Sequence, residues 1–189
     1  MHFFMFFGSL TTSKCERKTQ RKTQKRKALF FLVDVMLAKL GRWLRILGIN
    51  AEDPEDKSDD AILFQAKSKN LILLTMDEEL AERARRLKIT TVLIPHRMAK
   101  SIDQLFYIVK KFRIPLKNFV ERTLCTKCGG ELEIIDSKDV AKYLPPNVLK
   151  RFKEVWRCVK CGHLYWPGSH WKQINETVAR IEKKCRKKQ

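Results

Sequence analysis

Four cysteines in this 189-residue chain have the spacing that a tetrahedral metal site requires. Cys125 and Cys128 form one Cys-x-x-Cys pair, Cys158 and Cys161 form a second, and a glycine follows each pair directly. Each turn of this kind can present two thiolates to one ion, and four thiolates complete the coordination of Zn²⁺. Because such a site has no open position for catalysis, we predict structural zinc rather than a redox role.

Acidic side chains occur where apolar runs end. Asp34 lies inside the apolar run 29–35, where an unpaired charge is costly, and Asp77 follows the apolar run 71–75. Asp59 and Asp60 open the segment between them, although a single acid at such a position is more often a helix cap. Carboxylates brought together repel one another, and Mg²⁺ or Mn²⁺ relieves that repulsion. On a basic protein, such a site favours metal-dependent hydrolysis of phosphodiester bonds.

Alternating strand and helix patterns position these acids. Short apolar runs without alternation are typical of strands buried on both faces, and amphipathic segments with helical spacing follow each of them. We predict strands at 29–35, near 50, at 71–75 and at 90–95, and helices at 35–48, 58–70, 77–88 and 101–112. This order predicts an α/β fold with a parallel sheet and helices on both faces. The acids would meet at the carboxyl edge of that sheet.

The composition changes after about Leu124. The two cysteine pairs read as two short hairpins separated by a linker that contains Pro145 and Pro146. A stretch rich in Trp and His and a basic helix from Gln173 follow. We therefore expect a basic, disordered extension at 1–27, a nuclease-like domain at 28–120, a zinc ribbon at 121–172 and a basic helix or tail at 173–189.

The net charge of +19 indicates an anionic partner, because basic groups bind nucleic acid through counterion release. Much of the excess lies in residues 1–27 and 180–189, where a solvated tail is an equally good explanation. No apolar stretch reaches the roughly 18–20 residues of a membrane span. The apolar segment 1–10 has no basic segment before it, which is the wrong order for a secretory signal. We expect a cytoplasmic protein without a membrane partner.

Three blocks together resemble a known family: VDVMLAKLGRWLRILG, SDDAILFQAKSKNLILLTMDEEL and YWPGSHW, with the two cysteine pairs between the last two. They look like the Mut-7 C-terminal RNase domain family, a PIN-like fold followed by a zinc ribbon, over roughly residues 30–172. The resemblance implies a Mg²⁺- or Mn²⁺-dependent endoribonuclease acting on single-stranded RNA, with Asp34 as the first-strand acid, Asp77 as the acid after the third strand and Asp60 as the acid between them. Auxiliary positions are Asp59 as the rival of Asp60, Glu79 or Asp103 as a fourth acid, and Thr75 as a hydrogen-bond partner of a metal-binding carboxylate.

Two groups of residues suit RNA contacts. Arg42 and Arg45 are three residues apart on one predicted helix, where they could steer phosphates or form an ordinary solvated face. The second group combines aromatic side chains that can stack on unpaired bases with neighbouring polar ones, unless it forms the core of the ribbon. Its members are Trp166, His170, Trp171 and Lys172.

Four other functions compete with this interpretation. A PIN domain joined to a zinc ribbon also occurs in endonucleases that mature ribosomal RNA, so the ribosome or a ribosomal RNA precursor is a candidate partner. A non-catalytic RNA- or ribosome-binding adaptor would keep the fold without needing the acids. A toxin-type PIN ribonuclease would share the acids but usually lacks the ribbon. A receiver domain also gathers acids at strand ends, but no well-placed lysine accompanies them here.

Overall fold

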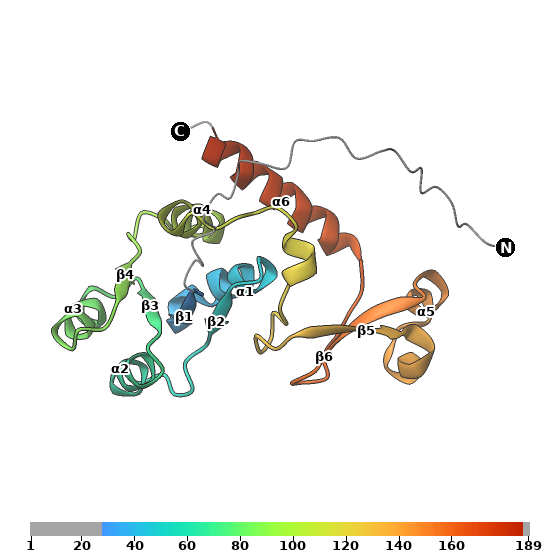
Figure 1. Cartoon of the computed structure of the whole chain (residues 1–189), viewed down its shortest axis with the longest axis horizontal. Helices are drawn as coiled ribbons and strands as arrows, with labels where there is room; N and C mark the ends of the chain where they lie inside the picture. Colours follow the sequence, from blue (N-terminus) through green and yellow to red (C-terminus); the bar gives the residue numbers. More distant parts are fainter. Residues whose placement is uncertain (1–27, 187–189) are drawn as a thin grey trace, which may run out of the picture.

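A computed structural model describes residues 28–186, which contain a four-stranded parallel sheet and a three-stranded antiparallel sheet (Figure 1). The extension expected at residues 1–27 lies outside the described residues. The strands of the parallel sheet are β1 (Phe30–Val33), β2 (Asn50–Glu52), β3 (Ile72–Thr75) and β4 (Thr91–Leu93). The predicted α/β class with a parallel sheet is therefore confirmed.

The strand order β2-β1-β3-β4 creates a switch point beside β1. The chain passes from β1 to β2 on one side and then crosses back to place β3 on the other side of β1. Leu32 of β1 accordingly pairs with Glu52 of β2 and with Leu73 of β3. Open α/β sheets form their sites at such a point, beyond the carboxyl ends of the strands.

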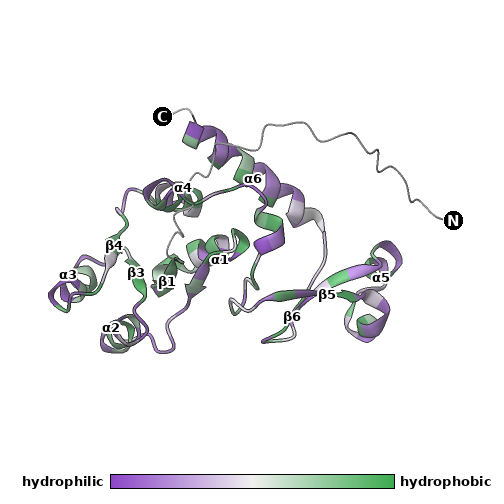
Figure 2. Ribbon diagram, viewed as in Figure 1, coloured by the Kyte–Doolittle hydropathy of each residue, from purple (hydrophilic) through white to green (hydrophobic). Residues whose placement is uncertain are grey.

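Helices cover both faces of this sheet, as predicted (Figure 1). One face packs against α1 (Ala38–Ile46), which the 3₁₀ turn η1 (Val35–Leu37) precedes, and against α4 (Ser101–Phe112). The other face packs against α2 (Asp59–Ser68) and α3 (Glu78–Arg86). Phe31 and Leu32 point into opposite cores, which explains why β1 is apolar without alternation. Figure 2 shows β1 and β3 in hydrophobic colours.

Gly48 ends α1 with a left-handed backbone of φ +73°. Its N–H donates to the carbonyl oxygen of Arg45 at 3.0 Å, so this glycine closes the end of the helix. A Cβ at this position would lie only 2.5 Å from the carbonyl oxygen of Arg122. Arg122 ends the 3₁₀ turn η2 (Phe119–Arg122), and this close approach fixes the segment that leads into the first cysteine pair against α1.

The cysteine-containing region forms the antiparallel sheet, with strands β5 (Leu132–Asp136), β6 (Glu154–Cys158) and β7 (Leu164–Tyr165) in that order. The prediction of two separate hairpins is half correct, because only β6 and β7 form one. β5 instead pairs with β6 across a helical insertion made of the 3₁₀ segment η3 (Ser137–Tyr143) and α5 (Pro146–Arg151). Val140, Val148 and Val155 form a small core beneath this insertion.

The last helix, α6 (Ser169–Arg186), starts four residues before the predicted Gln173. It returns to the parallel-sheet region, where Val178 and Ile181 are buried in the same core as α1 and α4 (Figure 1). The proposed domain boundaries stay predictions, but this helix shares a core with the first region of the chain. Within residues 28–186, no helix is long and apolar enough to cross a membrane.

Candidate functional site

Asp34 lies at the switch point, directly after β1. Its N–H donates to the carbonyl oxygen of Leu74 at 3.0 Å, which extends the pairing with β3 by one residue. The side chain is buried, with 6% of the residue exposed. A buried carboxylate needs partners, and Oδ2 of Asp34 accepts a hydrogen bond of 2.6 Å from the hydroxyl of Thr75. Thr75 therefore takes the predicted role of a hydrogen-bond partner to this acid.

The same hydroxyl connects Asp34 to Asp77. Oγ1 of Thr75 accepts the N–H of Asp77 at 2.9 Å, so its own proton is directed to Asp34. The carboxylate of Asp77 caps α3, with Oδ1 accepting the N–H of Leu80 at 2.9 Å. Among the described residues, no hydrogen bond uses Oδ1 of Asp34 or Oδ2 of Asp77. The ends of β1 and β3 thus hold two oriented carboxylates, each with one oxygen available to a ligand.

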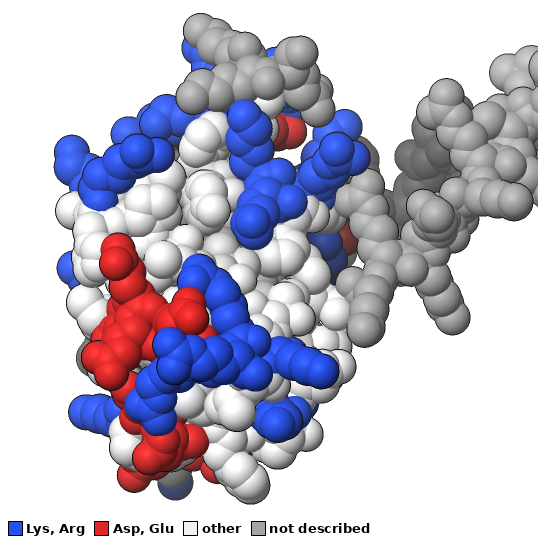
Figure 3. Space-filling view, turned by 90° about the vertical axis from the view of Figure 1, so that its left-hand side faces the viewer, with Lys and Arg blue, Asp and Glu red and all other residues white. Residues whose placement is uncertain are grey.

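The structure does not bring Asp60 to this pair. Its side chain is 89% exposed and forms an ion pair with Arg83 of α3, which also binds Asp59 at 3.0 Å. Asp60 borders a shallow groove between α2 and α3, beside Phe64 and Leu87. On this face, acidic side chains gather beside basic ones that cross them (Figure 3). The expected convergence of three acids is therefore absent, because an arginine on the neighbouring helix engages the third.

The two candidates for a fourth acid differ in their surroundings. Glu79 is exposed in the first turn of α3, close in sequence to Asp77. Asp103 lies in the first turn of α4, and Nζ of Lys184 from α6 approaches its carboxylate at 3.8 Å. Within residues 28–186, the only group of three or more potential metal ligands that the structure brings together contains no carboxylate at all.

That group consists of the four predicted cysteines, whose sulfurs all lie within 4.8 Å of one another: Cys125, Cys128, Cys158 and Cys161. The separations are 3.6 Å between Cys125 and Cys161 and 3.5 Å between Cys128 and Cys158, too long for disulfides. With Zn–S bonds of about 2.3 Å, the sulfurs of a tetrahedral site lie about 3.8 Å apart. The arrangement therefore fits a zinc ion, and the region has the form of a zinc ribbon.

The surroundings of the sulfurs favour a bound cation. Burial opposes ionisation of Cys125, but the hydroxyl of Tyr165 and backbone N–H groups of the first turn lower the pKa of this thiol to about 6. Burial raises the pKa of Cys128 to about 12, and the neighbouring thiols add to this effect against an opposing backbone hydrogen bond from Gly130. The thiol of Cys125 ionises readily and that of Cys128 resists, so a positive ion between them favours ionisation of both.

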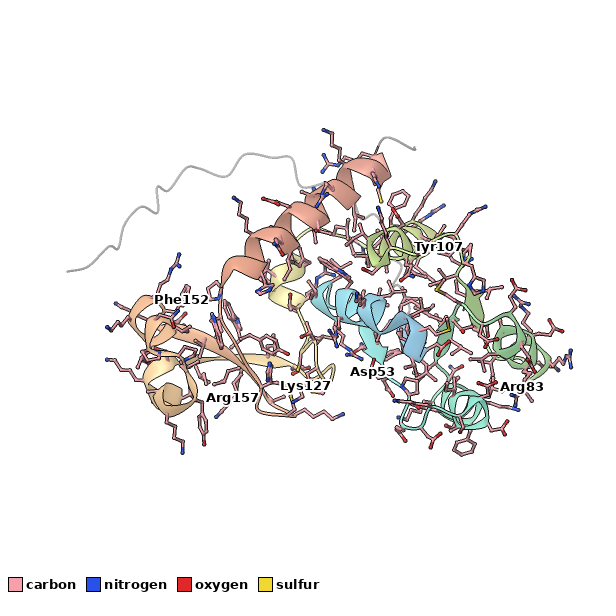
Figure 4. All side chains as sticks on the ribbon, turned by 180° about the vertical axis from the view of Figure 1, so that it is seen from behind. Asp53, Arg83, Tyr107, Lys127, Phe152 and Arg157 are labelled. Carbon is pink, nitrogen blue, oxygen red and sulfur yellow. The ribbon has the colours of Figure 1, made fainter. Side chains whose placement is uncertain are left out.

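The structure argues against the prediction that Arg45 contacts RNA. Only 2% of the residue is exposed, and its guanidinium is fully engaged. It donates to the carbonyl oxygens of Ala51 at 2.7 Å and Thr126 at 2.9 Å, and pairs with Asp53 at 2.8 Å. Figure 4 labels Asp53 and Lys127, which flank this contact. Because Thr126 lies between two cysteines, Arg45 joins α1 and β2 to the zinc ribbon.

A cavity of about 720 Å³ separates the two regions on the side of α1 and the start of α6. Four residues predicted to contact RNA line it: Arg42, Trp166, His170 and Trp171. Lys172, the fifth, is exposed on α6 and does not line the cavity. Trp156 of β6 and Tyr165 of β7, which the sequence analysis did not single out, complete its aromatic wall.

The sequence matches the family described as the Mut7-C RNAse domain over residues 30–178. The match covers the parallel sheet, the cysteine site and the first half of α6. No curated protein and no solved structure matches the chain.

Proposed function

The chain belongs to the Mut7-C RNAse domain family, and from that premise we propose that it is a metal-dependent endoribonuclease. Its substrate is single-stranded or structured RNA, and the reaction is hydrolysis of a phosphodiester bond. The matched family indicates a ribonuclease-type function, and RNA is the substrate class that this implies. Precursors of ribosomal RNA are a substrate class to test first, since they would also connect the protein to the ribosome.

The observation that carries the proposal is the pair Asp34 and Asp77, joined through Thr75 at the switch point. Mg²⁺ is commonly held by only one or two carboxylates, with water and substrate phosphate oxygens at its other positions. The two free carboxylate oxygens fit that requirement without a third acid. Asp60 and Asp59 then act in the ion pairs with Arg83 rather than as ligands.

The side chains around the pair fix its geometry before any ligand arrives. Asp34 cannot rotate freely, because it is buried and bonded to Thr75. Asp77 is held by its cap on α3 and remains partly exposed, so it faces the solvent from which RNA would approach. A bound Mg²⁺ or Mn²⁺ would supply Lewis acidity toward the phosphate and lower the pKa of a coordinated water. In-line attack of water predicts products with 5′-phosphate and 3′-hydroxyl ends.

A non-catalytic RNA-binding adaptor is the second candidate, and one observation favours it. The acid pair lacks the third carboxylate that the family resemblance implied, because Asp60 is engaged elsewhere. An adaptor of this kind would bind RNA with the same zinc ribbon and would cleave nothing. The two candidates therefore differ in a single measurable property.

The test is cleavage of end-labelled single-stranded RNA by purified protein in Mg²⁺ or Mn²⁺. We expect cleavage by the wild type and its loss in Asp34→Asn and in Asp77→Asn. Asp136→Asn is the matched control, because Asp136 also caps a helical segment through a backbone N–H, at 2.8 Å, but lies in the ribbon. Binding without cleavage in either metal would establish the adaptor, and cleavage that survives both substitutions would place the active site elsewhere.

A further inference from the structure

We propose that the cavity between the parallel-sheet region and the zinc ribbon captures one unpaired base of the RNA. This inference rests on the proposed ribonuclease function for the identity of the ligand. It adds a specific requirement to that function, because a base enclosed in a cavity must have left its duplex. The cavity would thus direct the enzyme to single-stranded segments.

The lining has the flat aromatic walls that a base requires. Trp156, Tyr165, Trp166 and Trp171 contribute their rings, and the volume of about 720 Å³ is in the range of small-molecule sites. Stacking on such rings accepts any base, because every base has a π-face. Trp171 is anchored by Phe119, whose ring centroid lies 6.3 Å away, so this wall is fixed to the core of the sheet region.

The polar groups of the cavity are largely unused donors. Within residues 28–186, Arg42 forms no ion pair or hydrogen bond, and neither do the indole N–H groups of Trp156, Trp166 and Trp171. Half-buried indole N–H groups usually have a partner, and an unpaired guanidinium beside aromatic rings suits a phosphate or a base edge. Glu121 is an acceptor on the same lining and suits the N–H groups of a base. A nucleotide has complementary groups for all of them.

The position of the cavity connects it to the acid pair. Arg42 is on α1, and Asp34 precedes Arg42 by eight residues, which is about two helical turns. We expect an RNA strand whose base enters the cavity and whose phosphate meets Arg42 to continue along α1 toward Asp34 and Asp77. The zinc ribbon contributes the opposite wall, since Tyr165 contacts the sulfur of Cys125 at 3.1 Å.

The test compares two labelled 12-mers, oligouridine and an abasic ribose-phosphate oligomer, by fluorescence anisotropy. All proteins are full-length and carry Asp34→Asn to prevent cleavage. We expect Trp166→Ala and Arg42→Ala to weaken oligouridine binding about tenfold, with Trp166→Phe close to the parent. Lys150→Ala, which removes an exposed charge on α5 outside the cavity, should change little. The affinity for the abasic oligomer should be the same in the Trp166→Ala protein as in the Asp34→Asn protein without it.

Two results would overturn the cavity proposal. One is unchanged oligouridine affinity in both cavity variants, and the other is an equal loss for both oligomers in folded Trp166→Ala protein. Cleavage by protein with Asp34 intact, measured in parallel, separates this failure from that of the proposed function. If Arg42→Ala cleaves RNA with an unchanged KM, the protein is a ribonuclease but the cavity does not bind a base. If the cavity variants weaken binding but the protein never cleaves RNA, the cavity binds a base but the protein is not a ribonuclease.

Discussion

The acid pair and the cysteine cluster are both built from anionic ligands, but the fold completes only one of them. Four sulfurs approach to tetrahedral distances and leave no position for a substrate. In the proposed function, Asp34 and Asp77 would supply two oxygens and would leave the rest of a coordination shell to water and phosphate. We therefore propose that the number of ligands supplied by the protein distinguishes the structural ion of the ribbon from a catalytic ion at the acid pair.

The two sites also depend differently on their ions. The acid pair lies on a parallel sheet whose cores form without any ligand, and hydrogen bonds from Thr75 and Leu80 orient its carboxylates. The cysteine cluster joins two turns of a region whose own apolar core is small. We therefore expect zinc to be part of the folding of the ribbon, and Mg²⁺ or Mn²⁺ to be a ligand of a fold that already exists.

Removal of zinc should have the largest effect. Structural zinc contributes about 10–16 kcal/mol of binding free energy in small zinc modules, so Cys158→Ser should lose the metal and the order of the ribbon. Hydrogen exchange should then show unprotected amides in β5 and β6, while β1 and β3 stay protected. A Cys185→Ser variant is the control, because Cys185 lies in α6 outside the cluster. If the amides of β6 stay protected from exchange without bound zinc, the ribbon folds without its ion and does not differ from the acid pair in this respect.

Asp34→Asn should have the next largest effect, on activity rather than on stability. Loss of a metal-binding carboxylate should reduce the cleavage rate about 10³-fold, since a catalytic ion is worth several kcal/mol of transition-state stabilisation. The amide can still accept the hydrogen bond from Thr75, so the fold should persist. The measurement is the single-turnover cleavage rate together with thermal unfolding. Equal losses of activity and of folded protein would indicate a structural acid.

Arg45→Met should weaken the connection between the two regions. It leaves the carbonyl oxygens of Ala51 and Thr126 without their donor, which should lower the free energy of unfolding by about 2–3 kcal/mol. Arg42→Met on the same helix is the matched control, because Arg42 is exposed and has no partner among the described residues. Urea titration of both variants measures the difference. Similar unfolding midpoints would mean that Arg45 does not hold the ribbon in place.

Thr75→Val should have a smaller effect. The substitution keeps the shape of the side chain but removes the hydroxyl that orients Asp34 and receives the N–H of Asp77. Loss of an orienting partner of a metal ligand typically costs 10–100-fold in metal affinity or activity, and we expect about 10-fold here. A Mn²⁺ titration of the cleavage rate should show a raised half-saturating concentration, with Thr91→Val of β4 as the control. An unchanged metal requirement would show that Asp34 is oriented by burial alone.

The sequence predicts the parallel sheet and the cysteine site well because both depend on local patterns. An apolar run without alternation identifies β1 and β3, and helical spacing gives α4 its observed bounds of Ser101–Phe112. The two Cys-x-x-Cys turns carry their own geometry, so the cluster can be recognised before the strands between them are known.

Features that depend on contacts distant in sequence were predicted less well. Asp60 lies in the first turn of α2, as expected. Its position in that turn does not reveal its partner, which is Arg83 on α3. Arg45 and Arg42 are three residues apart and were treated as one face, yet the ribbon covers only Arg45. The pairing of β5 with β6 crosses a helical insertion that local hairpin patterns do not reveal.

We propose that Asp34 and Asp77 share one divalent cation, and electron paramagnetic resonance of Mn²⁺ with zinc-loaded protein tests this directly. We expect a Mn²⁺ site in the wild type that Asp34→Asn and Asp77→Asn each weaken about tenfold or more, while Asp60→Asn and Asp136→Asn leave it unchanged. Equal Mn²⁺ affinity in all five proteins would contradict the claim, as would loss of the site in Asp60→Asn alone.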